Sequence, residues 1–176
     1  KGANYSSAEY LMFIDDDAYI LKAGVRNLDT FLKTNLYDVL LLKRADRYPK
    51  TRDKISIRNF SNYVIEWNLI IRRSVFREFK GFPSIGVGSK SKAQSGESFL
   101  LVGRMISSKK VKIKLVLDTE VSHPTLSLDL TENKAKGYLY GNGFAIGLLS
   151  RELIFIDKLY WLVRVHLGFV KRTTFA

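Results

Sequence analysis

The order of apolar and polar positions along the chain predicts strands that alternate with helices. An apolar run over residues 10–15 indicates a buried strand, and the apolar side chains of residues 22–33 recur with the period of an amphipathic helix. A second apolar run, over residues 38–43, predicts the next strand. The further expected elements are strands over 66–72 and over 112–117, continued by 119–122, and helices over 1–9, 74–79, 97–107 and 132–149. A strand followed by a helix is typical of an α/β protein.

Two polar segments interrupt this alternation. Residues 44–58 are basic and contain Pro49, which favours a loop or an edge hairpin. Residues 86–96 are rich in glycine and serine and have no large apolar residue to anchor them. The second segment is either an active-site loop or a plain linker.

The last part of the chain is different in character. The expected helix over 132–149 contains four glycines, each of which costs about 1 kcal/mol relative to alanine in a helix interior. Residues 152–175 form an apolar, aromatic stretch that charged residues interrupt, so it is no continuous membrane span. Tyr160, Trp161 and the basic ends suit a membrane interface, whereas a helix packed on the core accounts equally well for the same pattern.

Composition limits the classes of protein to which the chain can belong. Its 176 residues are 46% hydrophobic, which fits one globular domain with a substantial core. The chain has no cysteine, which excludes disulfides and thiolate chemistry, and its net charge of +12 favours an anionic partner: nucleic acid, a phosphorylated substrate or an acidic membrane. The first residues read like the end of a helix, so we expect a fragment whose missing part precedes residue 1.

Three consecutive aspartates, residues 15–17, directly follow the first apolar run. Side chains alternate across a strand, so Asp15 and Asp17 can point the same way while Asp16 points oppositely. Neighbouring carboxylates repel one another unless they share a proton or bind a cation, and Mg²⁺ and Mn²⁺ prefer oxygen ligands. The triplet therefore predicts a divalent-metal site, with a solvated acidic turn as the alternative.

Six short motifs in order resemble a family-two glycosyltransferase of the GT-A fold: FIDDDAYI, IIRRSVF, GF, GVGS to SGES, SHP and KGYLYGNG. The most similar subgroup builds surface or capsular polysaccharide. The resemblance covers residues 1 to about 150 and implies a mixed sheet flanked by helices in a partial GT-A domain. In that family the nucleotide-binding units would precede residue 1, and residues 151–176 would form a C-terminal amphipathic helical segment.

The resemblance also implies a metal and donor site. Asp15 and Asp17 would hold Mg²⁺ or Mn²⁺ and, through it, the diphosphate of a nucleotide sugar, with Asp16 nearer the ribose or the sugar. His123 matches a histidine that in some relatives ligates the metal or touches the diphosphate, although a strand-end histidine is often structural. Imidazole suits Mn²⁺ better than Mg²⁺.

The catalytic base of the family lies in a Gly-Glu-Asp motif, which reads Gly96-Glu97-Ser98 in this chain. A serine hydroxyl is too weak a base near neutral pH to replace the aspartate. We therefore expect Glu97 to be the base, or the transferase to be impaired. An acidic residue in a first helical turn that only complements the helix dipole is the structural alternative.

Two further residues are expected at the donor. Arg104 lies seven residues after Glu97 and so on the same face of the expected helix, where it could meet phosphate. Tyr138 belongs to a segment that, by resemblance, closes over the site. The alternatives are solvated surface charge for Arg104 and helix packing for Tyr138.

The leading hypothesis is an inverting, metal-dependent transferase that moves a sugar from a nucleotide-diphosphate donor to a saccharide or lipid-linked acceptor in surface polysaccharide synthesis. We expect it to be cytoplasmic, possibly at the inner face of the cell membrane, with no nucleic acid as partner. The alternatives are a basic nucleic-acid-binding domain, another magnesium enzyme such as a phosphatase with a strand-end aspartate nucleophile, and a degenerate transferase that only binds.

Overall fold

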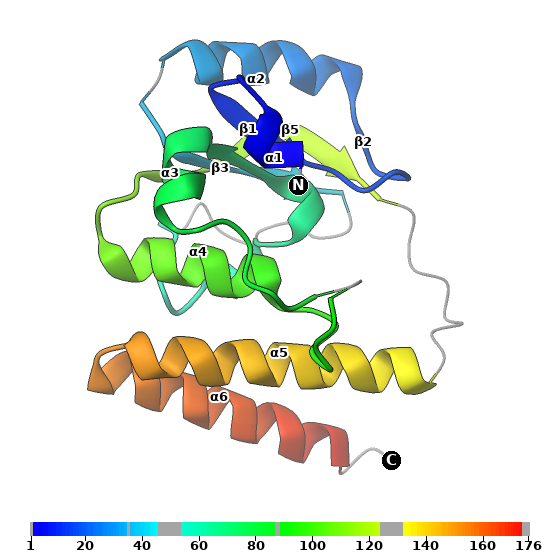
Figure 1. Cartoon of the computed structure of the whole chain (residues 1–176), viewed down its shortest axis with the longest axis vertical. Coiled ribbons are helices and arrows are strands. Elements are labelled where there is room, and N and C mark those ends of the chain that lie inside the picture. The colour runs from blue at the N-terminus through cyan, green and yellow to red at the C-terminus, as the bar shows by residue number, and fades with distance from the viewer. Residues whose placement is uncertain (1, 35, 46–53, 87–88, 124–131, 174–176) are drawn as a thin grey trace.

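The structure is a computed structural model that describes the whole chain except residues 1, 35, 46–53, 87–88, 124–131 and 174–176 (Figure 1). In chain order its elements are α1 (Gly2–Tyr5), β1 (Tyr10–Phe13), β2 (Tyr19–Ile20), α2 (Lys22–Thr34), β3 (Val39–Arg44), the 3-10 helices η1 (Phe60–Asn62) and η2 (Glu66–Asn68), β4 (Leu69–Arg72), α3 (Arg73–Glu78), α4 (Glu97–Ser108), β5 (Ile113–Ser122), α5 (Glu132–Glu152) and α6 (Phe155–Thr173). The expected mixture of strands and helices is thus confirmed.

The strands form one mixed sheet of five strands in the order β1-β4-β3-β5-β2. Strand β4 is antiparallel to both β1 and β3, and β3 is parallel to β5. Strands β1, β3 and β5 therefore run in the same direction and end at the same edge of the sheet. In an open α/β sheet this edge is where ligands bind.

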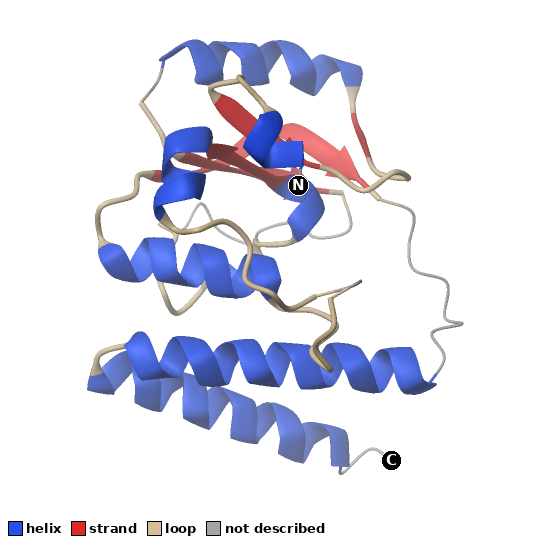
Figure 2. Cartoon of the chain, viewed as in Figure 1, coloured by secondary structure: helices blue, strands red, loops and turns tan. Residues whose placement is uncertain are grey.

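Helices cover both faces of the sheet (Figure 2). On β3, Val39 and Leu41 belong to the core cluster that includes Leu100 of α4, whereas Leu40 and Leu42 belong to the cluster that includes Leu28 of α2. These four side chains of β3 are each at most 1% exposed. Strand β3 reads as a continuous apolar run because both of its faces are buried.

Helices α5 and α6 form a further layer beyond α4 (Figure 1). Helix α6 is attached to the core through Trp161, which is 2% exposed and lies against the rings of Phe60 and Phe99. The prediction of a helix packed on the core is therefore correct for this face of α6. No helix in the described part of the chain combines the length and the apolar character needed to cross a membrane.

Two expected elements differ from the structure. The helix expected over residues 1–9 extends only over Gly2–Tyr5. The strand expected over residues 66–72 begins at Leu69, because the buried Asn68 side chain donates hydrogen bonds to the carbonyl oxygens of Leu42 and Tyr63 and so holds the preceding residues in a 3-10 turn. Most of the basic segment expected as a loop or hairpin, residues 46–53, lies outside the described residues.

Candidate active site

Two carboxylates and one imidazole meet at the sheet edge where β1 and β5 end. Nε2 of His123 lies 3.3 Å from Oδ2 of Asp15 and 3.0 Å from Oδ1 of Asp17. One potential ligand atom from each of these residues lies within 4.8 Å of the other two. The His123 side chain is 16% exposed and both carboxylates are about half exposed, so the cluster is open to solvent on its acidic side.

The two aspartates converge because the chain turns after β1. Strand β1 ends at Phe13, and the backbone N–H of Ala18 donates a hydrogen bond of 3.1 Å to the carbonyl oxygen of Asp15. The alternation of a strand, on which we expected the aspartates to be arranged, therefore does not apply to them. Asp16 is exposed and is not a member of the cluster.

Aromatic stacking fixes the imidazole. The ring of Trp67, which is 6% exposed, stacks on His123 with a centroid distance of 5.3 Å and an interplanar angle of 19°. The guanidinium of Arg44 lies 5.1 Å from the centroid of the Trp67 ring. Because Trp67 is buried between these groups, it limits the rotation of the His123 ring and keeps Nε2 toward the aspartates.

Glu97 is the first residue of α4 and is partly buried. Burial raises the pKa of its carboxyl group from 4.5 to about 7, and the negative charges of Glu66 and Asp15 add to this rise. Its Oε2 atom is buried and has no hydrogen-bond partner in the described part of the chain. The group is therefore poised to take or give a proton near neutral pH.

Gly86 makes room for this carboxyl group. A Cβ atom at Gly86 would lie 2.2 Å from Oε1 of Glu97, and the φ angle of +101° at this residue is one that side chains rarely adopt. The loop expected at residues 86–96 thus begins directly against Glu97. Residues 87–88 of this loop lie outside the described residues.

Ser98, the residue that departs from the family motif, is hydrogen-bonded to a carboxylate. It is 4% exposed, and its hydroxyl group donates to Oε1 of Glu66 over 3.1 Å. Glu66 belongs to η2, which the antiparallel register of β1 and β4 places beside the aspartate turn. A carboxylate therefore reaches Ser98 from another element of the fold.

Helix α5 packs closely on the segment that leads into α4. A Cβ atom at Gly141 would lie 2.5 Å from the backbone nitrogen of Ser95, and one at Gly137 would lie 3.2 Å from the Gln94 side chain. The hydroxyl of Ser95 donates 2.8 Å to the carbonyl oxygen of Tyr138. Two of the four α5 glycines thus allow the close approach that positions the start of α4.

Arg104 and Tyr138 take part in helix packing. The Arg104 guanidinium forms an ion pair with Glu152 at 2.7 Å, which joins α4 to the end of α5. Tyr138 contributes its carbonyl oxygen to the contact with Ser95. The contacts described for these two residues do not include the Asp15, Asp17 and His123 cluster, and their expected role at the donor stays a prediction.

Glu66, Trp67 and Arg44 were missed by sequence analysis. Residues 66 and 67 were expected in a strand, and Arg44 in a basic loop. Glu66 meets Ser98, which lies 32 positions later in the chain, and Trp67 stacks on His123, which lies 56 positions later. No local sequence pattern indicates either contact.

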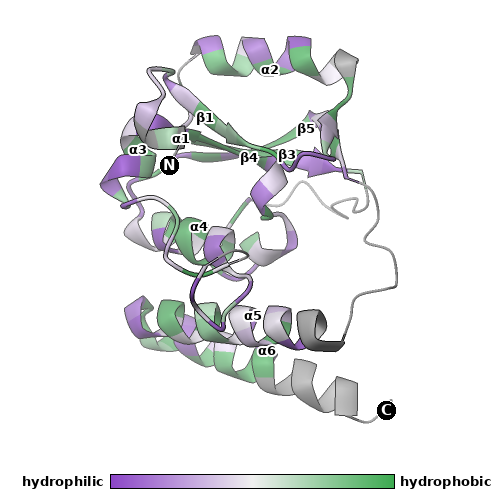
Figure 3. Ribbon diagram, turned by 45° about the vertical axis from the view of Figure 1, so that its right-hand side comes forward, coloured by the Kyte–Doolittle hydropathy of each residue, from purple (hydrophilic) through white to green (hydrophobic). Residues whose placement is uncertain are grey.

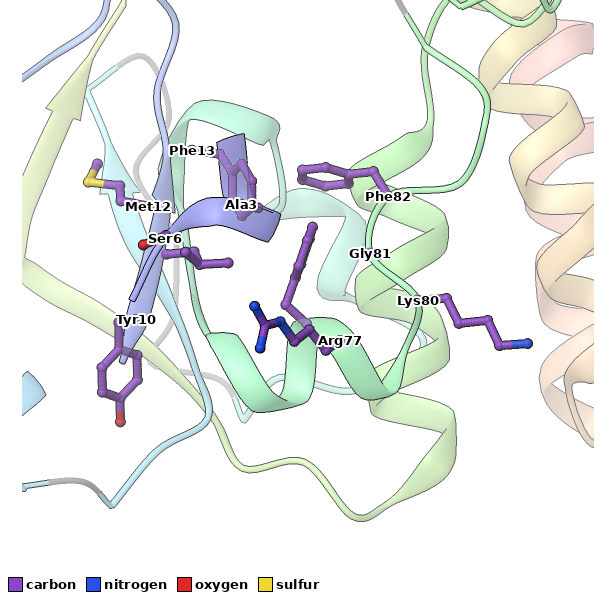
Figure 4. A pocket seen from close by; sticks show the side chains of 11 residues that line it. Ala3, Ser6, Tyr10, Met12, Phe13, Arg77, Lys80, Gly81 and Phe82 are labelled. Atoms are coloured by element: carbon purple, nitrogen blue, oxygen red, sulfur yellow. The ribbon is translucent and has the colours of Figure 1, made fainter. Parts of the chain in front are cut away.

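A cavity of about 920 Å³ lies beside β1, which is an edge strand of the sheet (Figure 4). Its lining includes Phe13, whose ring packs edge-on against Phe82 at a centroid distance of 4.7 Å. Arg77 and Lys80 add positive charge to the lining. Asp15, Asp17, His123 and Glu97 are not among the residues that line this cavity.

No family model and no curated sequence matches the chain, but several solved structures are similar to it, among them structures of S. aureus TarS. S. aureus TarS 1–349 in complex with UDP-GlcNAc has a TM-score of 0.59 and 18% identity over 85% of this chain and 44% of that chain. TarS 1–349 without ligand has a TM-score of 0.58 and 16% identity over 91% of this chain and 48% of that chain. Its complex with UDP has a TM-score of 0.54 and 17% identity over 85% of this chain and 42% of that chain. The chain therefore spans less than half the length of these TarS chains, and the likeness shows a shared mixed α/β fold.

Proposed function

We propose that this chain is the diphosphate- and acceptor-binding part of an inverting, metal-dependent glycosyltransferase. It would move a sugar from a nucleotide-diphosphate donor to a saccharide or lipid-linked acceptor in surface polysaccharide synthesis. The observation that carries this proposal is the cluster of Asp15, Asp17 and His123 at the sheet edge, with the partly buried Glu97 near enough for the charge of Asp15 to raise its pKa.

The shared fold supports this proposal. Crystal structures of TarS, which shares this fold, hold UDP-GlcNAc or UDP. A nucleotide-sugar donor is therefore the ligand class that fits best, while the particular nucleotide and sugar stay open. The GT-A type of the fold is part of the same proposal.

The donor atoms of the cluster fit a divalent cation. Two carboxylates and one imidazole suit Mn²⁺, and Mg²⁺ would accept the carboxylate oxygens with water in its other positions. A bound cation would neutralise the diphosphate and the charge that develops on it as the sugar leaves. Because Asp15 and Asp17 are about half exposed, diphosphate oxygens can approach from the solvent side.

The protein's own part in the reaction is proton transfer and positioning. Glu97 would take the proton of an acceptor hydroxyl while that oxygen forms a bond to the anomeric carbon. The bond between the anomeric carbon and the diphosphate oxygen breaks at the same step, so the configuration inverts and the nucleoside diphosphate leaves. A carboxyl group with a pKa of about 7 suits this role at neutral pH.

The serine in the family motif need not impair the enzyme. Ser98 is hydrogen-bonded to Glu66, so a second carboxylate lies next to Glu97 even though α4 itself supplies only one. We assign Asp16 to the ribose or the sugar, and Arg104 and Tyr138 to the donor. For Arg104 this role would require the donor phosphate to compete with Glu152.

The location that we propose is the cytoplasm, at the inner face of the cell membrane, where a lipid-linked acceptor would be available. The acceptor and the linkage formed stay open.

Turnover in the full-length protein tests the function. Transfer or slow hydrolysis of UDP-GlcNAc should be lost in Asp17→Ala, and Glu97→Gln should lose about 100-fold or more in rate while it still binds the donor. Asp29→Ala serves as the matched control, because Asp29 is an exposed carboxylate that pairs with Lys33 on α2, away from the sheet edge. Activity that survives both site substitutions would refute the assignment of roles.

A further inference from the structure

Three polar side chains of helix α6, those of Asp157, Tyr160 and Arg164, face the protein. Oδ1 of Asp157 accepts a hydrogen bond of 2.9 Å from Arg58, and the hydroxyl of Tyr160 donates 3.0 Å to the carbonyl oxygen of Arg58. Arg164 donates 3.1 Å to Oδ1 of Asn62. These groups, which would face water on an ordinary surface helix, instead attach α6 to the segment before β4.

The apolar side chains of α6 consequently point outward. We define the outer face of α6 by the exposed apolar residues of this helix and of the turn before it: Ile154, Phe155, Ile156, Leu159, Leu162, Val163 and Val165. Phe155 is 78% exposed and Leu162 is 52% exposed. Five of these residues, at positions 155, 156, 159, 162 and 163, recur at the spacing of one helix stripe, and apolar colour follows the described part of α6 in Figure 3.

The helix cannot turn this face inward without losing its anchor. The indole N–H of Trp161 donates 3.1 Å to the carbonyl oxygen of Ile57, and the ring is buried against Phe60 and Phe99. Trp161, which the sequence suggested as a membrane-interface residue, therefore belongs to the core. Within the described part of the chain, the apolar side chains of the outer face stay exposed.

Charge indicates which partner would suit this face. Lys158 is exposed and lies at the edge of the outer face, about one turn after Phe155 and one turn before Leu162, and Arg151 is exposed at the end of α5. The neighbouring acidic residues are engaged, Asp157 with Arg58 and Glu152 with Arg104. A second copy of the chain would bring another net charge of +12 against this face, whereas an anionic surface would complement it.

We propose that the outer face of α6 rests on an anionic lipid surface. Its apolar side chains would enter the boundary between headgroups and acyl chains, and Lys158 and Arg151 would lie among the headgroups. The proposal deepens the proposed location at a membrane by naming the surface that makes the contact. It rests on the proposed function only for this location and does not depend on sugar transfer.

Vesicle co-sedimentation of the 176-residue chain tests this proposal. We expect the chain to pellet with vesicles of phosphatidylcholine and phosphatidylglycerol, and the double substitution Phe155→Ser with Leu162→Ser to weaken this partitioning about tenfold or more. The matched control is Val25→Ser with Leu36→Ser, which removes two apolar side chains of comparable exposure from the region of α2. Lys158→Glu should weaken binding to the mixed vesicles about fivefold and leave binding to pure phosphatidylcholine unchanged.

Three results would overturn the proposal. The first is equal pelleting of the α6 double variant and its control, and the second is no pelleting of the wild-type chain. The third is self-association in analytical ultracentrifugation that the α6 variant abolishes, which would assign the face to a second copy. Mn²⁺ binding is measured on the same samples, because the cluster of Asp15, Asp17 and His123 lies at the sheet edge and not on α6. Loss of vesicle binding with Mn²⁺ binding retained would refute the membrane contact alone, whereas absence of Mn²⁺ binding would count against the proposed function.

Discussion

The hydroxyl group of Ser98 donates a hydrogen bond of 3.1 Å to Oε1 of Glu66. Ser98 occupies the position at which the resembled family has its catalytic carboxylate, and Glu66 comes from the 3-10 turn before β4. The charge of Glu66 also contributes to the raised pKa of Glu97, so Glu66 interacts with both Ser98 and Glu97. The serine at this position is thus hydrogen-bonded to a carboxylate from a different element of the fold.

Substitutions of Glu66 and Ser98 should separate the effect of charge from that of the hydrogen bond. Glu66→Gln removes a negative charge next to Glu97, so the pKa of Glu97 should fall toward its usual value. Ser98→Ala keeps that charge and should change this pKa less, while it lowers the stability by about 1 kcal/mol. Carboxyl-carbon NMR titration of the chain measures the pKa, and equal shifts in both variants would contradict this explanation.

The protonation of Glu97 should also affect the pH dependence of stability. Its pKa is about 7 in the folded chain and near 4.5 when exposed, so between these values the folded state binds more protons than the unfolded state. The contribution of Glu97 to stability is therefore present below about pH 4.5 and is lost as the pH rises toward 7. Glu97→Gln, which stays neutral, should raise the thermal midpoint at pH 8 relative to wild type.

The same comparison at pH 4 provides the control. Glu97 is protonated there in both states, so the difference between the variant and wild type should shrink. A thermal midpoint difference that does not change between pH 4 and pH 8 would mean that the carboxyl group titrates normally.

Metal binding can be measured on the chain without any turnover. Mn²⁺ titration followed by electron paramagnetic resonance should show that the chain binds the ion. Asp17→Ala or His123→Ala should weaken the affinity for Mn²⁺ by more than the roughly tenfold loss that follows when a residue outside the coordination shell is replaced. The reason is that each substitution removes one of three potential ligands that lie within 4.8 Å of one another. Asp29→Ala should bind like wild type, and an equal loss in that control would indicate non-specific attraction to surface carboxylates.

Sequence analysis identified the local parts of this site more readily than the distant ones. Asp15 and Asp17 follow an apolar run that ends in charge, and this pattern is visible within eight residues. His123 was suggested by its match to a histidine of the resembled family, but its approach to the aspartates depends on β1 and β5 ending at the same sheet edge. That arrangement depends on the strand order, which periodicity does not contain.

Glu66 and α6 show why the remaining features could not be predicted. The start of β4 is delayed by hydrogen bonds from the Asn68 side chain to residues 26 and 5 positions away, and no local propensity encodes these bonds. The apolar stripe of α6 was recognised, but which side of the helix faces the core is decided by Trp161 and by the polar contacts with the segment before β4. Both features are tertiary, so they required the structure.

The glycines of α5 offer a matched pair of substitutions for the last prediction. A methyl group at position 141 would lie 2.5 Å from the backbone nitrogen and 2.6 Å from the carbonyl oxygen of Ser95, and backbone atoms cannot move aside as a flexible side chain can. Gly141→Ala should therefore destabilise the chain by about 1–3 kcal/mol, as overpacking in a tight contact does. The shift should also displace the start of α4 and with it Glu97, which NMR would detect as a change in its titration.

Gly143→Ala is the control, because a methyl group there meets nothing within 4 Å. This substitution should stabilise the chain by up to about 1 kcal/mol through the better helix propensity of alanine, and it should leave the titration of Glu97 unchanged. Urea denaturation of the two variants and of wild type measures both effects. If Gly141→Ala were as stable as Gly143→Ala, the close packing of α5 on the segment before α4 would be absent in solution, and the explanation of how Glu97 is positioned would fail.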